Sequence, residues 1–131
     1  MDRVKERLEE GLKALETLEK VVDLPKPSDI ERDAAIQRFE YTFEMTWKAA
    51  QAYLTDREFL ETGSPRAAIR GSFRVGLFDD EIAEKFMEMA NDRNLTVHTY
   101  KEEFAVQIYL RLAGHAALLR LWLEEIQKRV E

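Results

Sequence analysis

Residues 92–100 decide where the last long helix of the chain begins, and they run Asp92-Arg93-Asn94-Leu95-Thr96-Val97-His98-Thr99-Tyr100. Arg93 is permanently charged, and its guanidinium forms forked hydrogen bonds to phosphate or carboxylate groups. His98 can give and take a proton near neutral pH. Together they have the chemistry to cleave a phosphodiester without a metal, because an imidazole moves protons and a guanidinium stabilises charge on phosphorus. A salt bridge and a helix cap would use the same two residues.

Helix geometry restricts how these side chains can meet. Five helical positions turn a side chain by about 500°, so Arg93 and His98 would point about 140° apart in an unbroken helix. Asn94 and His98 are four positions apart and would share a face. Thr99 and Glu102 form a candidate capping box, which predicts a helix boundary inside the stretch. We therefore expect Arg93 and His98 to converge only if the helix breaks or two chains of a dimer meet there.

The first half of the chain predicts two long helices. Apolar residues at steps of three and four mark residues 2–22, and Pro25 and Pro27 end this helix. Ser28 and Glu31 form a capping box that opens a helix to about residue 57. This second helix is apolar on two nearly opposite faces, Phe39, Phe43, Trp47, Ala50 and Leu54 on one and Tyr41, Met45, Ala49 and Tyr53 on the other. Such a helix packs between neighbours or against another chain.

The second half predicts three further helices. Gly63 is expected to end a helix, and Ser64 to cap a short one over residues 65–75. A fourth begins at residue 79 or 80 and runs into Arg93, and the last covers about residues 100–130 with two apolar stripes. The fold class is all-α, an antiparallel four- to five-helix up-and-down bundle formed by a single domain of residues 1–131. The wide apolar coverage of the second and last helices predicts a two-fold homodimer.

Composition excludes several classes. With 45% hydrophobic and 35% charged residues the chain resembles an ordinary globular protein. No cysteine is present, so a disulfide framework, a thiolate nucleophile and a cysteine-ligated zinc are excluded. A formal net charge of −6 argues against a general nucleic-acid coat protein. Arginines interrupt the most apolar window, which argues against a membrane span, and the charged start is unlike a secretory signal. A cytoplasmic location is expected.

Other charged groups have competing interpretations. The predicted short helix carries three arginines at four-residue steps, Arg66, Arg70 and Arg74. They could bind the phosphates of RNA, form a docking face for a partner, or simply be a solvated ridge. His115 lies four residues after Arg111 in the apolar last helix, and we interpret it as a core or interface histidine. Glu40 and Glu44 have metal-ligand spacing, but no Glu-x-x-His partner accompanies them, so we expect no metal and no cofactor.

Four segments, in order along the chain, carry a resemblance to a known family: Arg38–Lys48, Ser64-Pro65-Arg66, Gly76-Leu77, and Arg93-x4-His98-x-Tyr100. Together they resemble the HepT-like proteins of the HEPN ribonuclease superfamily, also described as nucleotidyltransferase substrate-binding proteins. The R-x4-H element is short, and the ordered set is much more specific. The resemblance runs from about Arg38 to Tyr100.

The resemblance implies a ribonuclease toxin that cleaves RNA without a metal. It implies catalytic roles for Arg93 and His98, with Asn94 in support, at the interface of a homodimer. It further implies that a partner minimal nucleotidyltransferase acts as antitoxin by adding adenylyl groups to Tyr100. The alternative is a non-catalytic subunit that presents a substrate to such a partner. The chain itself has no nucleotidyltransferase Gly-Ser motif with paired aspartates and no phosphate-binding glycine loop.

Overall fold

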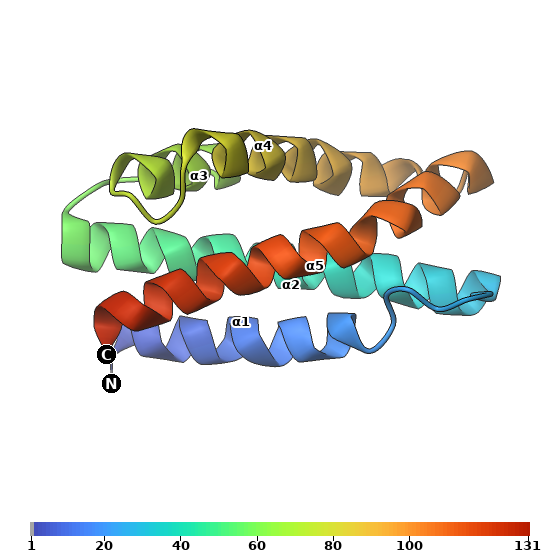
Figure 1. The fold of residues 1–131 in the computed structure, drawn as a ribbon, viewed down its shortest axis with the longest axis horizontal. Coiled ribbons are helices and arrows are strands. Elements are labelled where there is room, and N and C mark those ends of the chain that lie inside the picture. The colour runs from blue at the N-terminus through green and yellow to red at the C-terminus, as the bar shows by residue number, and fades with distance from the viewer. Residues whose placement is uncertain (1) are drawn as a thin grey trace.

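The computed structural model describes residues 2–131, and within this range it contains helices and no strands. The helices are α1 (Arg3–Glu19), α2 (Asp29–Glu58), α3 (Pro65–Arg74), α4 (Asp80–Leu95), the short 3-10 helix η1 (Thr96–His98), and α5 (Glu102–Val130) (Figure 1). None of the helices in this range is long and apolar enough to cross a lipid bilayer. The predicted all-α bundle is confirmed.

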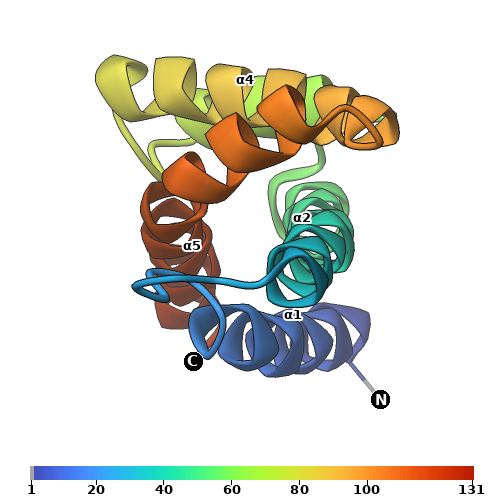
Figure 2. The same cartoon turned by 90° about the vertical axis from the view of Figure 1, so that its right-hand side faces the viewer.

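Helix α2 is central to the packing, with α1, α5 and α3 all against it. Viewed along the bundle, α1, α2, α4 and α5 surround the core, with α4 and α3 opposite α1 (Figure 2). Helix α5 crosses obliquely from the end of α4 to the start of α1 (Figure 1). The α4–α5 junction therefore lies at the opposite end of the molecule from the end of α5.

Large aromatic side chains fill the centre of the bundle. Trp122 on α5 is fully buried and packs against Phe78 and Phe86 at centroid separations of 5.9 and 4.7 Å. Its indole N–H donates to the Ser72 hydroxyl at 2.9 Å, so the buried donor is satisfied. This cluster joins the α3–α4 connection to α5 and fixes where α4 lies.

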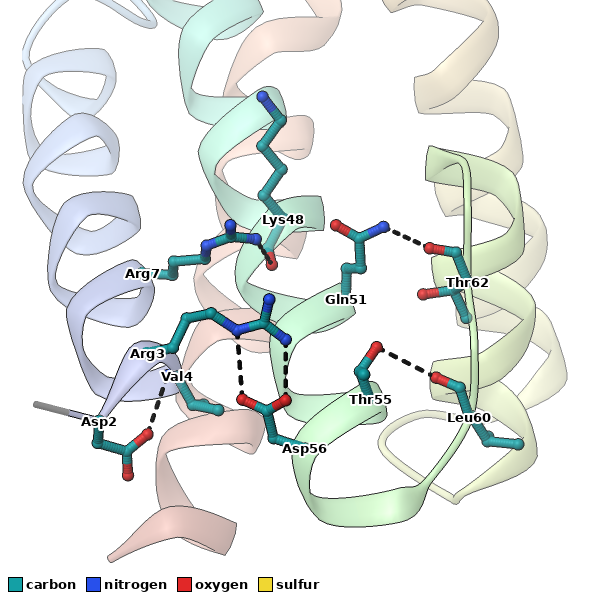
Figure 3. Close-up of polar contacts among 10 residues, drawn as sticks. All are labelled: Asp2, Arg3, Val4, Arg7, Lys48, Gln51, Thr55, Asp56, Leu60 and Thr62. Atoms are coloured by element: carbon teal, nitrogen blue, oxygen red, sulfur yellow. Dashed lines mark hydrogen bonds and ion pairs between the residues drawn. The ribbon is translucent and has the colours of Figure 1, made fainter.

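Polar contacts at the ends of α1 and α2 hold those helices in register (Figure 3). Arg3 forms a two-point contact with Asp56, the shorter bond being 2.8 Å, and the Arg7 guanidinium donates to the Lys48 carbonyl at 3.2 Å. On the other side of α2, Gln51 donates to the Thr62 carbonyl. The segment leading into α3 is thereby held against α2, which positions the first turn of α3.

Most predicted helix starts are confirmed by their caps. Ser28 and Glu31 form both bonds of the capping box, at 2.9 and 3.1 Å. Ser64 caps α3 by accepting from the Ala67 amide, and Asp79 caps α4 by accepting from the Ile82 amide. In each case a short polar side chain satisfies a first-turn amide that has no partner inside the helix.

Helix α2 ends at Glu58, within one residue of its predicted end, but Gly63 does not end it. Phe59 instead adopts the left-handed conformation with φ of 58°, and Leu60 donates to the Leu54 carbonyl. A second predicted cap is also wrong. The capping box at Thr99 does not form, since the Thr99 hydroxyl donates to the Thr96 carbonyl at 2.9 Å. Helix α5 instead begins at Glu102 without a side-chain cap.

Much of the second apolar face of α2 is covered within the chain. Ala49 and Tyr53 are buried, whereas Tyr41 is 36% exposed and shares a 2.6 Å hydrogen bond with the Thr17 hydroxyl of α1. The breadth of α2 therefore follows from its central position and needs no second chain. On α5 the situation differs, because Leu110 is 74% exposed and Val106 is 38% exposed.

Candidate functional site

The α4–α5 junction forms because the chain leaves the helix at Leu95. The Thr96 hydroxyl donates to the Arg93 carbonyl at 2.7 Å, a local bond that competes with helix continuation. Thr96 and Val97 are also β-branched, which lowers their helix propensity. A single 3-10 turn follows, closed by the Thr99 amide donating to the Thr96 carbonyl at 3.3 Å, and the Lys101 amide then donates to the His98 carbonyl at 3.1 Å. The predicted helix break between Arg93 and His98 is therefore present.

Arg93 is held by the acidic side of α2. Its guanidinium lies 3.7 Å from a carboxylate oxygen of Glu40 and 3.7 Å from one of Glu44, and it donates to the Thr96 hydroxyl at 3.2 Å. The two carboxylate distances exceed ordinary hydrogen-bond lengths. The Arg93 Nε, which is the atom facing Glu44, is buried and makes no hydrogen bond to a described residue. The guanidinium is thus oriented by charge, and its Nη2 also makes no hydrogen bond to a described residue.

A cavity of about 270 Å³ lies beside Arg93, lined by Phe43, Glu44, Ser64, Pro65, Arg66, Ala90, Arg93 and Asn94. It is formed where α2, the start of α3 and the end of α4 meet. Arg66 is fixed at its edge by a 2.6 Å hydrogen bond to the Asn91 side chain. Two guanidinium groups from different helices therefore face one cavity, together with the Asn94 amide.

His98 and Tyr100 lie at the surface beyond the end of α4. The Tyr100 hydroxyl is 3.5 Å from His98 Nδ1, and the rings meet edge to face at a centroid separation of 6.0 Å. Tyr100 is 76% exposed, and neither residue contributes to the core. The structure thus places Arg93 with Asn94 and Arg66, and His98 with Tyr100. Within one chain, His98 does not line the Arg93 cavity.

The second histidine has a structural environment. His115 is buried, donates from Nε2 to Asp92 at 2.7 Å, and stacks on Phe39 at 5.3 Å between ring centroids. Arg111 donates two bonds of 2.8 Å to the same carboxylate. Burial raises the pKa of the Asp92 carboxyl, but the bonds from His115 and Arg111 outweigh it and bring the pKa to about 2. This ionic cluster joins α4 to α5, and it agrees with the interpretation of His115 as a core histidine.

The three arginines of α3 do not share one environment. Arg66 faces the cavity beside Arg93, whereas Arg70 and Arg74 are exposed and line a separate hollow with Glu61 and Thr62. Arg66 in the first turn of α3 lies next to α4, whereas Arg70 and Arg74 lie further along the helix and away from that cavity. The three arginines therefore do not line one continuous pocket.

Some residues of the site escaped sequence reasoning. Glu40 and Glu44 showed only metal-ligand spacing, yet both face Arg93, and no cluster of the described residues is suited to hold a metal ion. No sequence pattern indicated that Asp92 would bind His115. The four-residue spacing of Glu40 and Glu44 on α2 marked the two glutamates as a pair, but only the tertiary fold shows that Arg93 is their partner.

Comparison with known proteins extends these observations. Residues 6–128 match the family model described as nucleotidyltransferase substrate binding protein like. A Haemophilus influenzae protein named "Probable ribonuclease HepT" is 28% identical over 100 residues, which cover 72% of this chain. The match spans 66% of that relative's own length.

Solved structures share the fold of this chain. A crystal structure of a Thermus thermophilus protein matches with a TM-score of 0.86 and 51% identity, over 88% of this chain and 98% of that one. The tri-AMPylated HEPN toxin of Shewanella oneidensis, solved with its MNT antitoxin, matches with a TM-score of 0.78 at 14% identity, over 98% of each chain. A mutant MntA toxin–antitoxin complex matches with a TM-score of 0.79 at 13% identity, over 98% of this chain and 99% of that one, and these two likenesses concern the fold alone. The chain belongs to the nucleotidyltransferase substrate binding protein like family, with the fold of the HepT-like HEPN proteins.

Proposed function

We propose that the protein is a HepT-like ribonuclease toxin that cleaves RNA in the cytoplasm without a metal ion, with a minimal nucleotidyltransferase as antitoxin. The observation that carries this proposal is the position of Arg93, Asn94, His98 and Tyr100 at one junction, outside the apolar core. Arg93 pairs with Glu40 and Glu44 but keeps its Nη2 free of hydrogen bonds to the described residues, and the His98 imidazole is exposed. The family match and the name of the Haemophilus influenzae relative support the same function.

The proposed reaction needs only protein side chains and the RNA itself. His98 of one chain takes the proton of a ribose 2′-hydroxyl, whose oxygen forms a bond to the neighbouring phosphorus. The bond from phosphorus to the 5′ oxygen breaks, and the His98 imidazolium of the second chain donates a proton to that leaving oxygen. Arg93 stabilises the negative charge that builds on the phosphoryl oxygens, with Asn94 as an additional donor.

A dimer is part of this proposal, because His98 lies outside the Arg93 cavity within one chain. Exposed apolar side chains next to the junction are suitable for burial against a second copy, and they are Val97, Val106 and Leu110. All three flank or follow His98, on η1 and the first turns of α5. A two-fold axis near this patch would bring two copies of Arg93 and His98 to one cleft.

Tyr100 is the proposed point of control. Its phenol is exposed, so the nucleotidyltransferase can present ATP to it. The phenolic oxygen would bond to the α-phosphorus, pyrophosphate would leave, and the phenolic proton would pass to solvent. An adenylyl group so close to His98 would occupy the space that RNA needs. The tri-AMPylated state of the Shewanella oneidensis toxin supports this form of regulation.

A non-catalytic subunit that presents a substrate to the nucleotidyltransferase is the second candidate. The family description and the cavity next to Arg66 favour it. The proposed experiment separates the two functions. Purified protein is incubated with single-stranded RNA and a metal chelator, beside Arg93→Ala and His98→Ala variants of unchanged fold. Cleavage by wild type alone supports the ribonuclease, whereas no cleavage by wild type and partner binding that tolerates His98→Ala support the binding subunit.

A further inference from the structure

We propose that the cavity between α2, α3 and α4 binds a phosphate group of RNA between the guanidinium groups of Arg66 and Arg93. The inference rests on the proposed function, and it distinguishes Arg66 from the other two arginines of α3. It adds to Arg93 a second guanidinium that comes from a different helix.

Both guanidinium groups are positioned but keep donors for a ligand. Arg66 is anchored by one short bond, 2.6 Å from its Nη2 to the Asn91 side chain, and its Nη1 has only a 3.8 Å contact with the Met87 sulfur. Arg93 faces Glu44 through its buried Nε and Glu40 through Nη1, both at 3.7 Å, and its Nη2 makes no hydrogen bond to a described residue. Each guanidinium therefore retains N–H donors of its terminal nitrogens for phosphoryl oxygens.

The donors and the size of the cavity favour a phosphate. Among the lining residues Arg66 and Arg93 outweigh the carboxylate of Glu44, and Asn94 adds a neutral donor. A second carboxylate, that of Glu40, lies 3.7 Å from Arg93 and outside the lining. The start of α3 borders the cavity as well, and its first-turn amides add partial positive charge. A volume of about 270 Å³ lies below the range of about 300–1,000 Å³ that is usual for whole small-molecule ligands. A phosphate within a strand fits this space better than a complete nucleotide.

Arg70 provides the matched control. It stands one turn after Arg66 on the same helix, but it is exposed and lines the other hollow. Arg66→Ala and Arg70→Ala each remove one positive charge from α3, so they weaken the long-range attraction of RNA to the same extent. A difference in RNA affinity between the two variants therefore reports on the cavity.

The test measures binding of a labelled single-stranded RNA by fluorescence anisotropy, with chelator, in a His98→Ala background. We expect Arg66→Ala to weaken binding about tenfold and to lower the slope of log affinity against log salt by about 0.7, the value for one phosphate contact in a single strand. Arg70→Ala should stay within about twofold of its parent. Equal losses in the two variants would overturn the proposal. Should Arg66→Ala misfold, Arg66→Lys replaces it, with a smaller expected loss because lysine offers only a point charge.

A second test adds either inorganic phosphate or adenosine to the wild-type protein and measures the chemical shifts of its backbone amides by NMR. Phosphate should shift the amides of Arg66, Ala67 and Asn94, and adenosine should not. Shifts caused by adenosine, or none caused by phosphate, would overturn the phosphate site. Because neither measurement needs cleavage, a protein that binds phosphate here but cuts no RNA would refute the ribonuclease alone. Cleavage without any difference between Arg66→Ala and Arg70→Ala would refute this inference alone.

Discussion

Replacing Asp92 by Asn should loosen the α4–α5 junction by a predictable amount. The Asp92 side chain is 11% exposed, and its carboxylate accepts bonds of 2.7, 2.8 and 2.8 Å from His115 and Arg111. Its pKa falls from 3.8 to about 2. At about 1.4 kcal/mol per pKa unit, the ionised group contributes about 2 kcal/mol to folding, and Asn loses that contribution. For a chain of this length the melting temperature should drop by about 6 °C at pH 7.

The pH dependence of this difference follows from the sign of the pKa change. The folded carboxyl has the lower pKa, so the unfolded chain binds more protons between about pH 4 and pH 2. The contribution of Asp92 is present above about pH 4 and is lost as the pH falls towards 2. Calorimetric melting of wild type and Asp92→Asn at pH 7, 4 and 2.5 should therefore show a gap that narrows with acid.

A surface acid serves as the control for this experiment. Glu19 pairs with Arg120 at 2.7 Å, but both side chains are about one-third exposed, so Glu19→Gln should cost less than about 1 kcal/mol. Equal melting temperatures of wild type and Asp92→Asn at pH 7 would refute the role assigned to the cluster. A gap that stays constant to pH 2.5 would refute its electrostatic origin.

Three further predictions concern single positions. Tyr100→Phe should accept no adenylyl group at that position when incubated with the nucleotidyltransferase and ATP, and its RNA cleavage should escape suppression, as mass spectrometry and a cleavage assay would show. Ser28→Ala removes the side-chain half of the capping box and should lower the free energy of unfolding by about 1 kcal/mol in urea melts, and an unchanged value would argue against the cap. Phe59→Gly should raise the free energy of unfolding by about 0.5 to 1 kcal/mol, because Phe59 is 87% exposed and left-handed, and a loss of stability would show that its ring has a packing role.

The helices could be predicted because their causes are local. Ser28, Ser64 and Asp79 cap their own first turns, and apolar spacing marks the buried stripes. The end of α2 lies within one residue of its predicted position, but the residue that ends it could not be predicted. Glycine is the usual left-handed residue after a helix, which favours Gly63, yet Phe59 takes that conformation. The Thr99 box failed because its hydroxyl has a closer acceptor in the Thr96 carbonyl.

The site was predictable only in part, since its contacts join distant segments. The junction of Arg93, His98 and Tyr100 was visible as a cluster of polar groups between two apolar patterns. The partners of Arg93 and Arg66 lie on other helices, where sequence spacing does not reveal them. The apolar second face of α2 suggested a dimer, but α1 and the other helices of the same chain cover much of it. The exposed part of α5 is the remaining support for a second copy.

The central claim is that the surface histidine of the α4–α5 junction, and not the buried one, performs the chemistry. It is tested most directly by the initial rate of RNA cleavage in the presence of a chelator, for wild type, His98→Ala and His115→Ala, below the melting temperature of each. His115→Ala should be less stable, because it loses the bond to Asp92 and the stacking on Phe39, but its folded fraction should cleave RNA at a rate close to wild type. His98→Ala should keep wild-type stability and lose cleavage by a factor of at least about 100. Full activity of His98→Ala, or loss of activity in folded His115→Ala, would contradict the account.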